Sequence, residues 1–200
     1  MHVCLLACWP RLVPREWFKV TSEIAPQPRR GACGAVSATL GFVIFGGHDS
    51  ISRDSVSAQL VGSQLFQLRL EAGAGVGQWG VVDVGDSADA PPALAYCSMA
   101  AKGDGGIFLS GGINGNLELM HDVFALEFEA AVAKWRWKRL RSPPFAGVEG
   151  AVVGQMMHQS AVLKGRLVLF GGYQLLPAER ARCVQVCVSS DGPDASMLAI

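Results

Sequence analysis

Two histidine–aspartate pairs are the residues best suited by type to acid–base or metal chemistry. They are His48-Asp49 and His121-Asp122, and each lies at the edge of an expected loop. An imidazole beside a carboxylate can bind a metal ion or move a proton, but either role needs a further group within reach. Nothing in the spacing brings such a group to either pair, so turn roles are favoured. We therefore predict no catalytic residue, no metal and no cofactor.

The six cysteines do not follow a metal-binding pattern either. No CxxC pair occurs, and the closest pairs are four residues apart. On one strand such a pair is separated by roughly 13 Å, which is too far to share one metal ion. Cys33 and Cys97 lie among small residues and are expected to pack as small hydrophobic side chains. His158 is expected to be a core or hydrogen-bonding residue. Reduced thiols are typical of intracellular proteins, so we expect a cytoplasmic location.

Residues 134–141 alternate basic side chains with Trp135 and Trp137. Such a pattern can bind phosphates and stack bases. It is also typical of an outer edge strand, where Lys and Arg discourage edge-to-edge pairing. The chain as a whole has 17 basic and 17 acidic residues, so no global field would recruit nucleic acid or an anionic membrane. No apolar run reaches the roughly 20 residues of a membrane helix. We predict neither a nucleic-acid nor a membrane partner.

The elements that would position these residues come from a repeated pattern. Three Gly-led apolar runs of strand length, at 41–47, 105–112 and 165–172, each end in a Gly-Gly pair. A unit repeated at long spacing indicates a repeat architecture. Proteins of this kind usually present a binding surface, so a binding role is favoured over an enzymatic one. The pairs are Gly46-Gly47, Gly111-Gly112 and Gly171-Gly172.

Other residues keep step with the Gly-Gly pairs. Thirteen positions before each pair are Cys33, Ser98 and His158, each in a small, mostly apolar segment. Trp79 follows the first pair, and Trp135 and Trp137 follow the second. Each unit therefore reads as four short strands, of which the second is apolar throughout and the fourth carries Trp. No Trp follows the third pair, so the pattern does not indicate a fourth strand for that unit.

This pattern resembles the Kelch repeat, in which a hydrophobic run ends in Gly-Gly and is followed by a spaced aromatic residue and Trp. The resemblance extends from about Trp17 to about Val188. It implies an all-β fold, a β-propeller of four-stranded blades. Its structural motif residues here are the three Gly-Gly pairs with Trp17, Trp79 and Trp137. The units are longer than the roughly 50 residues of a Kelch unit.

The resemblance predicts about three blades, too few to close a typical propeller of 4–8 blades. We therefore expect an open arc or an incomplete propeller. The expected organisation is an N-terminal extension at 1–14, an unpaired outer strand and linker at 15–28, repeats at 29–86, 87–142 and 143–190, and a tail at 191–200. The third repeat is expected to be incomplete. An open arc could close by self-association.

The expected function is non-catalytic protein binding, as a scaffold or adaptor. In the Kelch family, loops on one rim of the propeller grip the partner, and the rim-loop candidates here are His48, Arg53, Asn114, Asn116, His121 and Tyr173. One alternative is an enzyme or a small-ligand or metal binder of the galactose oxidase-like group. Its copper site needs a cysteine-linked tyrosine, a second tyrosine and two histidines. Tyr96 and Tyr173 are the only tyrosines, and Tyr96 and its neighbour Cys97 would point to opposite faces of a strand. The other alternative is an incomplete fragment without independent function.

Overall fold

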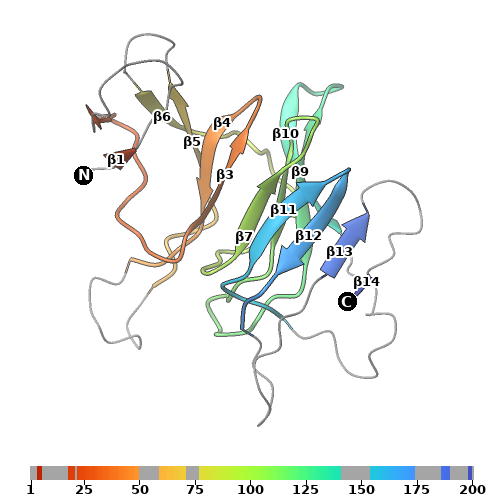
Figure 1. Ribbon diagram of the computed structural model, residues 1–200. Helices are drawn as coiled ribbons and strands as arrows, with labels where there is room; N and C mark the ends of the chain where they lie inside the picture. Colours follow the sequence, from red (N-terminus) through yellow and green to blue (C-terminus); the bar gives the residue numbers. More distant parts are fainter. Residues whose placement is uncertain are drawn as a thin grey trace, which may run out of the picture.

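The computed structural model describes residues 4–5, 18–20, 22–49, 59–70, 77–140, 154–173, 186–189 and 198–199. These residues form an all-β protein of three four-stranded antiparallel sheets and one two-stranded sheet (Figure 1). No helix that could span a membrane occurs among them. Two residues singled out from the sequence, Trp17 and Arg53, lie outside the described residues.

Each four-stranded sheet is built from consecutive strands of the chain. The first sheet contains β3 (Cys33–Ser37), β4 (Gly41–Phe45), β5 (Leu65–Leu70) and β6 (Gly77–Val81). The second contains β7 (Ser98–Ala101), β8 (Ile107–Ser110), β9 (Val123–Glu129) and β10 (Lys134–Leu140). The third contains β11 (Gln159–Leu163), β12 (Arg166–Phe170), β13 (Val186–Ser189) and β14 (Leu198–Ala199).

The Gly-led runs are the second strands, β4, β8 and β12, and the tryptophans lie on the fourth strands, as the pattern predicted. All four residues of β8 are buried, because the second sheet is covered on both faces. A strand covered on both faces needs apolar residues at consecutive positions rather than at alternate ones. This requirement explains the uninterrupted apolar runs of the sequence.

The sheets pack face to face, with their first strands side by side and β7 in contact with both β3 and β11 (Figure 1). Between the first and second sheets, Trp137 meets Phe45 edge-on with ring centroids 6.1 Å apart. A second core of Phe108, Leu167 and Leu169 joins the second and third sheets. On the outer face of the first sheet, Trp79 packs against Phe66, Leu68 and Val20.

Two strands at the ends of the chain differ from the expected arrangement. The strand at 15–28, expected to be unpaired, is β2 (Phe18–Lys19), and it pairs with β1 (Cys4–Leu5). The third sheet has a fourth strand without Trp, because β14 pairs with β13. Residues 198–199 were expected to belong to a tail.

The strand register corrects the expected alignment of the three units. Cys33 and Ser98 both pair with the residue before the Gly-Gly, but in the third unit that partner is Gln159. His158 therefore corresponds to Ala32 and Cys97, one position earlier. The cause is the hairpin between the first two strands. Leu163 pairs with Arg166 across the two-residue turn Lys164-Gly165, which has φ of 51° and 76°. In the first unit three residues separate the paired Ser37 and Gly41.

Candidate functional site

The loops that follow the Gly-Gly pairs lie at one end of the sheets, at the bottom of Figure 1, and we call this end the Gly-Gly rim. Each unit is joined to the next there by the same backbone bond. The N–H of Gly47 donates to the Leu94 carbonyl at 2.8 Å, and the N–H of Gly112 donates to the Gln155 carbonyl at 2.7 Å. A Cβ on Gly46 or Gly111 would overlap these carbonyl oxygens. Glycine is therefore required for the close approach of neighbouring units.

A second set of backbone bonds runs along the rim close to the first strands. The Tyr96 N–H donates to the Gly31 carbonyl at 2.6 Å, and the Met157 N–H donates to the Tyr96 carbonyl at 2.8 Å. All three residues adopt left-handed backbone, with φ of 67°, 58° and 57° for Gly31, Tyr96 and Met157. This conformation is strained for Tyr and Met, so the surrounding junction must hold it in place.

His48 takes part in the first junction rather than in the solvent-exposed rim. Its Nε2 lies 2.7 Å from the Tyr96 hydroxyl, and its residue is only 5% exposed. Burial lowers the pKa of His48, the charge of Arg30 lowers it further, and Asp49 opposes them. The imidazole is therefore favoured in its neutral form, which can make one hydrogen bond with the Tyr96 hydroxyl, as donor or as acceptor according to its tautomer. Its Nδ1 has no hydrogen-bond partner among the described residues.

The loop after the second Gly-Gly pair is organised by Asn114. Its side-chain oxygen accepts from the backbone N–H groups of Asn116 and Glu118, and its amide nitrogen donates to the Glu118 carboxylate at 2.7 Å. Asn114 thus shapes the turn that presents its neighbours. Asn116 is exposed, and Leu117 beside it is 75% exposed with φ of 62°.

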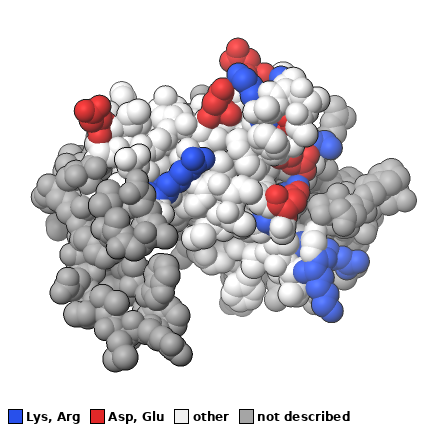
Figure 2. All heavy atoms as spheres, turned by 90° about the horizontal axis from the view of Figure 1, so that it is seen from above, with Lys and Arg blue, Asp and Glu red and all other residues white. Residues whose placement is uncertain are grey.

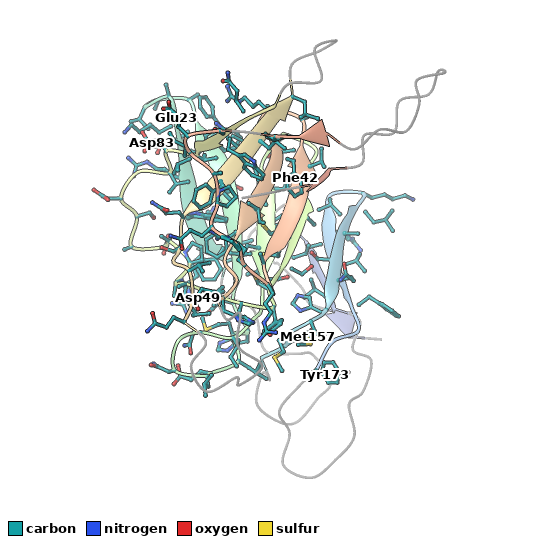
Figure 3. All side chains as sticks on the ribbon, turned by 90° about the vertical axis from the view of Figure 1, so that its left-hand side faces the viewer. Glu23, Phe42, Asp49, Asp83, Met157 and Tyr173 are labelled. Carbon is teal, nitrogen blue, oxygen red and sulfur yellow. The ribbon has the colours of Figure 1, made fainter. Side chains whose placement is uncertain are left out.

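Tyr173 and Met157 are the exposed side chains of the third unit at this rim (Figure 3). They are 56% and 47% exposed, and the Tyr173 backbone pairs with Met156 next to Met157. His121 is also exposed, whereas Asp122 beside it is buried and accepts a bidentate hydrogen bond from Arg139. Of the rim candidates, the structure therefore leaves Asn116, His121 and Tyr173 exposed, and it uses His48 and Asn114 internally.

Sequence reasoning did not single out Tyr96 and Met157 as rim residues. The signal was present for Tyr96, which stands fifteen residues before Gly111 as Gly31 stands before Gly46. A tyrosine at the position of a left-handed glycine is uncommon and indicates a local constraint. For Met157 the shorter hairpin of the third unit hides the correspondence.

Between the sheets, several buried polar side chains bond across the junctions, although His158 Nδ1 has no hydrogen-bond partner among the described residues. Cys33 and Cys97 are buried free thiols whose Sγ atoms lie 2.6 Å apart. Burial, the hydrogen bond with Cys97 and the charge of Cys97 together raise the pKa of the Cys33 thiol. At the next junction His158 Nε2 bonds the Ser110 hydroxyl at 2.9 Å. Burial lowers the pKa of His158 to about 4, so its imidazole is neutral at pH 7.

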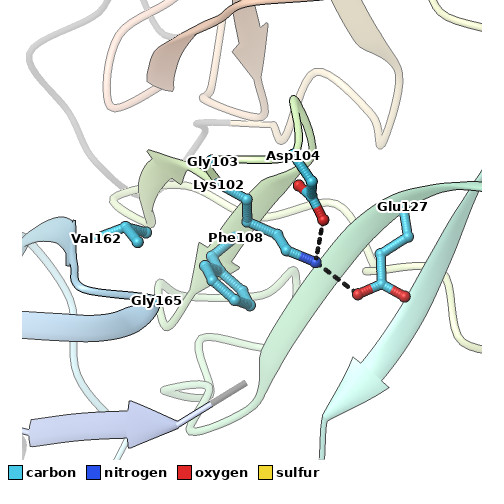
Figure 4. A pocket seen from close by; sticks show the side chains of 7 residues that line it. All are labelled: Lys102, Gly103, Asp104, Phe108, Glu127, Val162 and Gly165. Atoms are coloured by element: carbon cyan, nitrogen blue, oxygen red, sulfur yellow. Dashed lines mark hydrogen bonds and ion pairs between the residues drawn. The ribbon is translucent and has the colours of Figure 1, made fainter. Parts of the chain in front are cut away.

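A pocket of about 330 Å³ opens between the second and third sheets near their hairpins (Figure 4). The Lys102 ammonium lies 2.6 Å from the Glu127 carboxylate, 3.3 Å from that of Asp104 and 5.3 Å from the centre of the Phe108 ring. Burial alone would lower the pKa of Lys102, but the hydrogen bond to Glu127 and the two carboxylate charges outweigh it. The pocket therefore has one excess negative charge.

The basic strand β10 is largely neutralised. Its side chains form ion pairs, Lys134 with Asp83 at 3.1 Å, Arg136 with Glu129 at 2.6 Å and Arg139 with Asp122 at 2.6 Å. On the face seen in Figure 2 acidic and basic side chains are intermingled around an uncharged centre. The aromatic and basic residues of β10 therefore do not form a continuous cationic surface among the described residues.

Within the described residues, no group of three or more His, Cys, Asp or Glu side chains is arranged to hold a metal ion. A scan against protein-family models finds no match, and a search of curated proteins finds no significant similarity.

Proposed function

We propose that this protein is a Kelch-type β-propeller segment that binds another protein through its Gly-Gly rim and has no catalytic role. Each four-stranded sheet would be one blade. The observation that carries the proposal is that some rim residues bond within the protein while others are exposed to solvent. His48 and Asn114 hold the scaffold, while Asn116, Leu117 and Tyr173 are presented to solvent by loops fixed to it. Loops held by a rigid scaffold are common binding surfaces.

The composition of the exposed rim also supports a protein partner. Tyr173, Met157 and Leu117 offer apolar area, and Asn116 and His121 offer hydrogen-bonding groups beside them. Tyrosine and methionine are enriched in protein–protein interfaces, in which apolar contacts are surrounded by polar groups. The ion pairs of β10 disfavour the competing idea of a nucleic-acid surface, because paired guanidinium and ammonium groups neutralise few phosphates.

The test combines three substitutions at the rim, Asn116→Ala, His121→Ala and Tyr173→Ala. The matched control replaces three exposed residues elsewhere, Gln78→Ala, Val132→Ala and Lys138→Ala. Proteins retained by the immobilised chain would be quantified by mass spectrometry, and direct binding of each would then be measured by calorimetry. We expect the rim variant to lose a partner that the control retains. Equal retention by both variants, with unchanged melting curves, would refute the rim as the binding surface.

A small-ligand role is the second candidate, and the pocket beside Lys102 is the observation that favours it. Its excess negative charge suits a small organic cation or a donor-rich molecule. Thermal-shift screening of such compounds, with Glu127→Gln as the comparison, would test this role. A ligand whose stabilisation is lost in that variant would support it, and screening without any such ligand would count against it.

A further inference from the structure

The outer face of the third sheet carries apolar side chains that face away from the second sheet. Strand register places Phe170, Val168, Ala161 and Leu163 on this face of β11 and β12, together with the polar Gln159 and Arg166 at its edges. Phe170 is 55% exposed and Leu163 is 65% exposed. Large apolar side chains exposed together on a sheet face are a sign of an interaction site.

The same face of the other two sheets is buried by the sheet that follows. Val43 and Phe45 of the first sheet are 0% exposed, and Phe108 and Ser110 of the second are 2% exposed. Register aligns Phe170 with Phe45 and with Ser110, since each directly precedes a Gly-Gly pair. The outer face of the third sheet is therefore the counterpart of two faces that other sheets cover.

The backbone at this face is prepared for the same contact. A Cβ on Gly46 or Gly111 would overlap a carbonyl of the following unit, whereas a Cβ on Gly171 would meet nothing within 4 Å. Gly47 and Gly112 each donate to that carbonyl, but no described residue accepts from the N–H of Gly172. Gly171 has left-handed backbone, with φ of 73°. The space beside it is open, whereas a carbonyl of the following unit fills that space at Gly46 and Gly111.

The Met157 carbonyl is a second backbone group that lacks the partner its counterparts have. The carbonyls of Gly31 and Tyr96 each accept from the unit that follows, and the corresponding carbonyl of Met157 has no donor among the described residues. The third unit therefore offers one donor and one acceptor, Gly172 N–H and Met157 C=O, next to an apolar face.

The first unit offers the complementary half of this junction. In the second and third units, the carbonyls of Leu94 and Gln155 accept from Gly47 and Gly112. The residue at the same position of the first unit is Arg29. The N–H of Gly31 corresponds to those of Tyr96 and Met157. Neither the Arg29 carbonyl nor the Gly31 N–H is bonded to another backbone group of the described residues. The inner part of the first sheet's outer face is open as well, with Val36 72% exposed, whereas Val20 and Ala25 cover the part around Trp79.

We propose that a second copy of this chain docks head to tail, with its first sheet on the outer face of the third sheet. The same contact would form twice about a twofold axis and would close a ring of six sheets, within the 4–8 of known propellers. A second copy is favoured over another occupant because this chain carries both halves of the junction that already joins its own units. The proposal does not depend on what the Gly-Gly rim binds.

Sedimentation velocity over a concentration series tests the stoichiometry. We expect a species of about 42 kDa, twice the 21.2 kDa of the chain. Leu163→Asp places a charge in the proposed interface and should weaken dimerisation at least tenfold. Leu117→Asp, at a still more exposed position outside it, should leave dimerisation unchanged. A monomer at all concentrations up to about 100 µM, or equal weakening by both variants, would overturn the proposal.

Gly171→Ala tests the open space itself. The control is Gly85→Ala, since Gly85 also has left-handed backbone, with φ of 59°, and open space around it. Both variants bear the same backbone strain and should fold to a similar extent. Only Gly171→Ala should weaken dimerisation, again at least tenfold, because its methyl group would occupy the place of the partner's carbonyl. Equal dimerisation of the two variants would contradict the proposed contact.

A cross-link tests the head-to-tail direction. Cys33 and Cys97 face each other across the first junction with Sγ atoms 2.6 Å apart, and their counterparts at the proposed junction are Gln159 and Ala32. Chains bearing Gln159→Cys would be mixed with chains bearing Ala32→Cys and oxidised with glutathione disulfide, which takes up two electrons and two protons per bond formed. We expect a 159–32 cross-linked peptide by mass spectrometry in the mixture alone. A 159–159 cross-link in the Gln159→Cys sample would overturn the proposal.

Discussion

At the scale of single residues, the junctions between sheets depend on polar groups that are buried and neutral. His158 is 2% exposed and bonds Ser110 on the neighbouring sheet, and His48 bonds Tyr96 in the same manner at the rim. A buried imidazole remains favourable only while it is uncharged, because burial penalises the cation. These two histidines therefore each connect neighbouring units through a hydrogen bond of the neutral imidazole.

The neutral state of His158 makes stability depend on pH. Its pKa is about 4 in the folded chain and about 6.5 when unfolded. Since the folded pKa is the lower one, the unfolded chain binds the proton more readily. The contribution of neutral His158 to the free energy of unfolding is fully present above pH 6.5. As the pH falls toward 4, the free energy of unfolding decreases by about 3 kcal/mol. Urea unfolding at intervals from pH 7 to pH 4 measures this loss.

His158→Gln should flatten that pH dependence, because it removes the imidazole and keeps a hydrogen-bonding group near Ser110. His121→Gln removes an exposed imidazole and serves as the control. If His158→Gln left the slope between pH 6.5 and pH 4 as steep as in the parent chain, burial of His158 would not be its source.

The two facing thiols should be protected from alkylation in the native protein. Cys33 is buried, and its raised pKa keeps the thiolate population low at neutral pH. Only the thiolate attacks an alkylating reagent. We expect iodoacetamide to label Cys33 at pH 7.5 at a rate set by opening of the first junction, and rapidly in denaturant. Labelling of native Cys33 as fast as in denaturant would contradict the buried placement.

At the scale of elements, each junction combines an aromatic side chain on a fourth strand with a glycine on the rim. Trp137 on β10 is 3% exposed and meets Phe45 of the first sheet. Trp135, two residues earlier on the same face of the strand, is half-buried at the edge of the same core and meets Phe128 on β9 of its own sheet. The two tryptophans thus differ in how deeply they enter the core between the sheets.

Trp137→Ala should cost about 3–5 kcal/mol of unfolding free energy, because it leaves a cavity between two sheets. Trp135→Ala, the control on the same strand, should cost about 1–2 kcal/mol, because Trp135 lies at the partly solvated edge of that core. Chemical denaturation of both variants measures the difference. Similar losses for the two would show that Trp137 does not join the sheets.

Gly46→Ala should be much more damaging than Gly85→Ala. Both residues have left-handed backbone, which costs about 1–2 kcal/mol for a residue with a Cβ. Only at Gly46 would the methyl group also overlap the Leu94 carbonyl, and the junction bond of Gly47 would be lost with it. We expect a total loss above about 3 kcal/mol at Gly46. Comparable melting temperatures of the two variants would refute the tight junction.

Much of the element scale could be predicted from the sequence, because apolar runs, Gly-Gly pairs and tryptophans are local signals. The strand position of His158 could not be predicted. His158 precedes Gly171 by thirteen residues, as Cys33 precedes Gly46, but the Lys164-Gly165 hairpin is one residue shorter, so the same spacing gives a different register. The bond between His48 and Tyr96 joins residues 48 positions apart and leaves no local signal. The open space at Gly171 is equally invisible, since its Gly-Gly pair reads like the other two.

At the scale of the whole molecule, each four-stranded sheet packs on its neighbours, so stability should be the sum of local and nearest-neighbour terms. The second sheet is covered on both faces, and the third has one exposed face. We expect amide hydrogen exchange to be slowest in β8 and β9 and faster in β12. Measurement at a protein concentration at which sedimentation shows only the monomer isolates the single chain. Uniform protection across the three sheets would indicate one cooperative unit instead.

The close approach of Gly46 to Leu94 also has a consequence for synthesis. The first sheet cannot complete its rim until a residue 48 positions further along the chain has been made. At about 5–20 residues per second, that interval lasts roughly 2 to 10 seconds. During it the apolar face that contains Val43 and Phe45 has no cover. During this interval of synthesis, any other apolar surface on or near the ribosome can bind this face before the second sheet covers it.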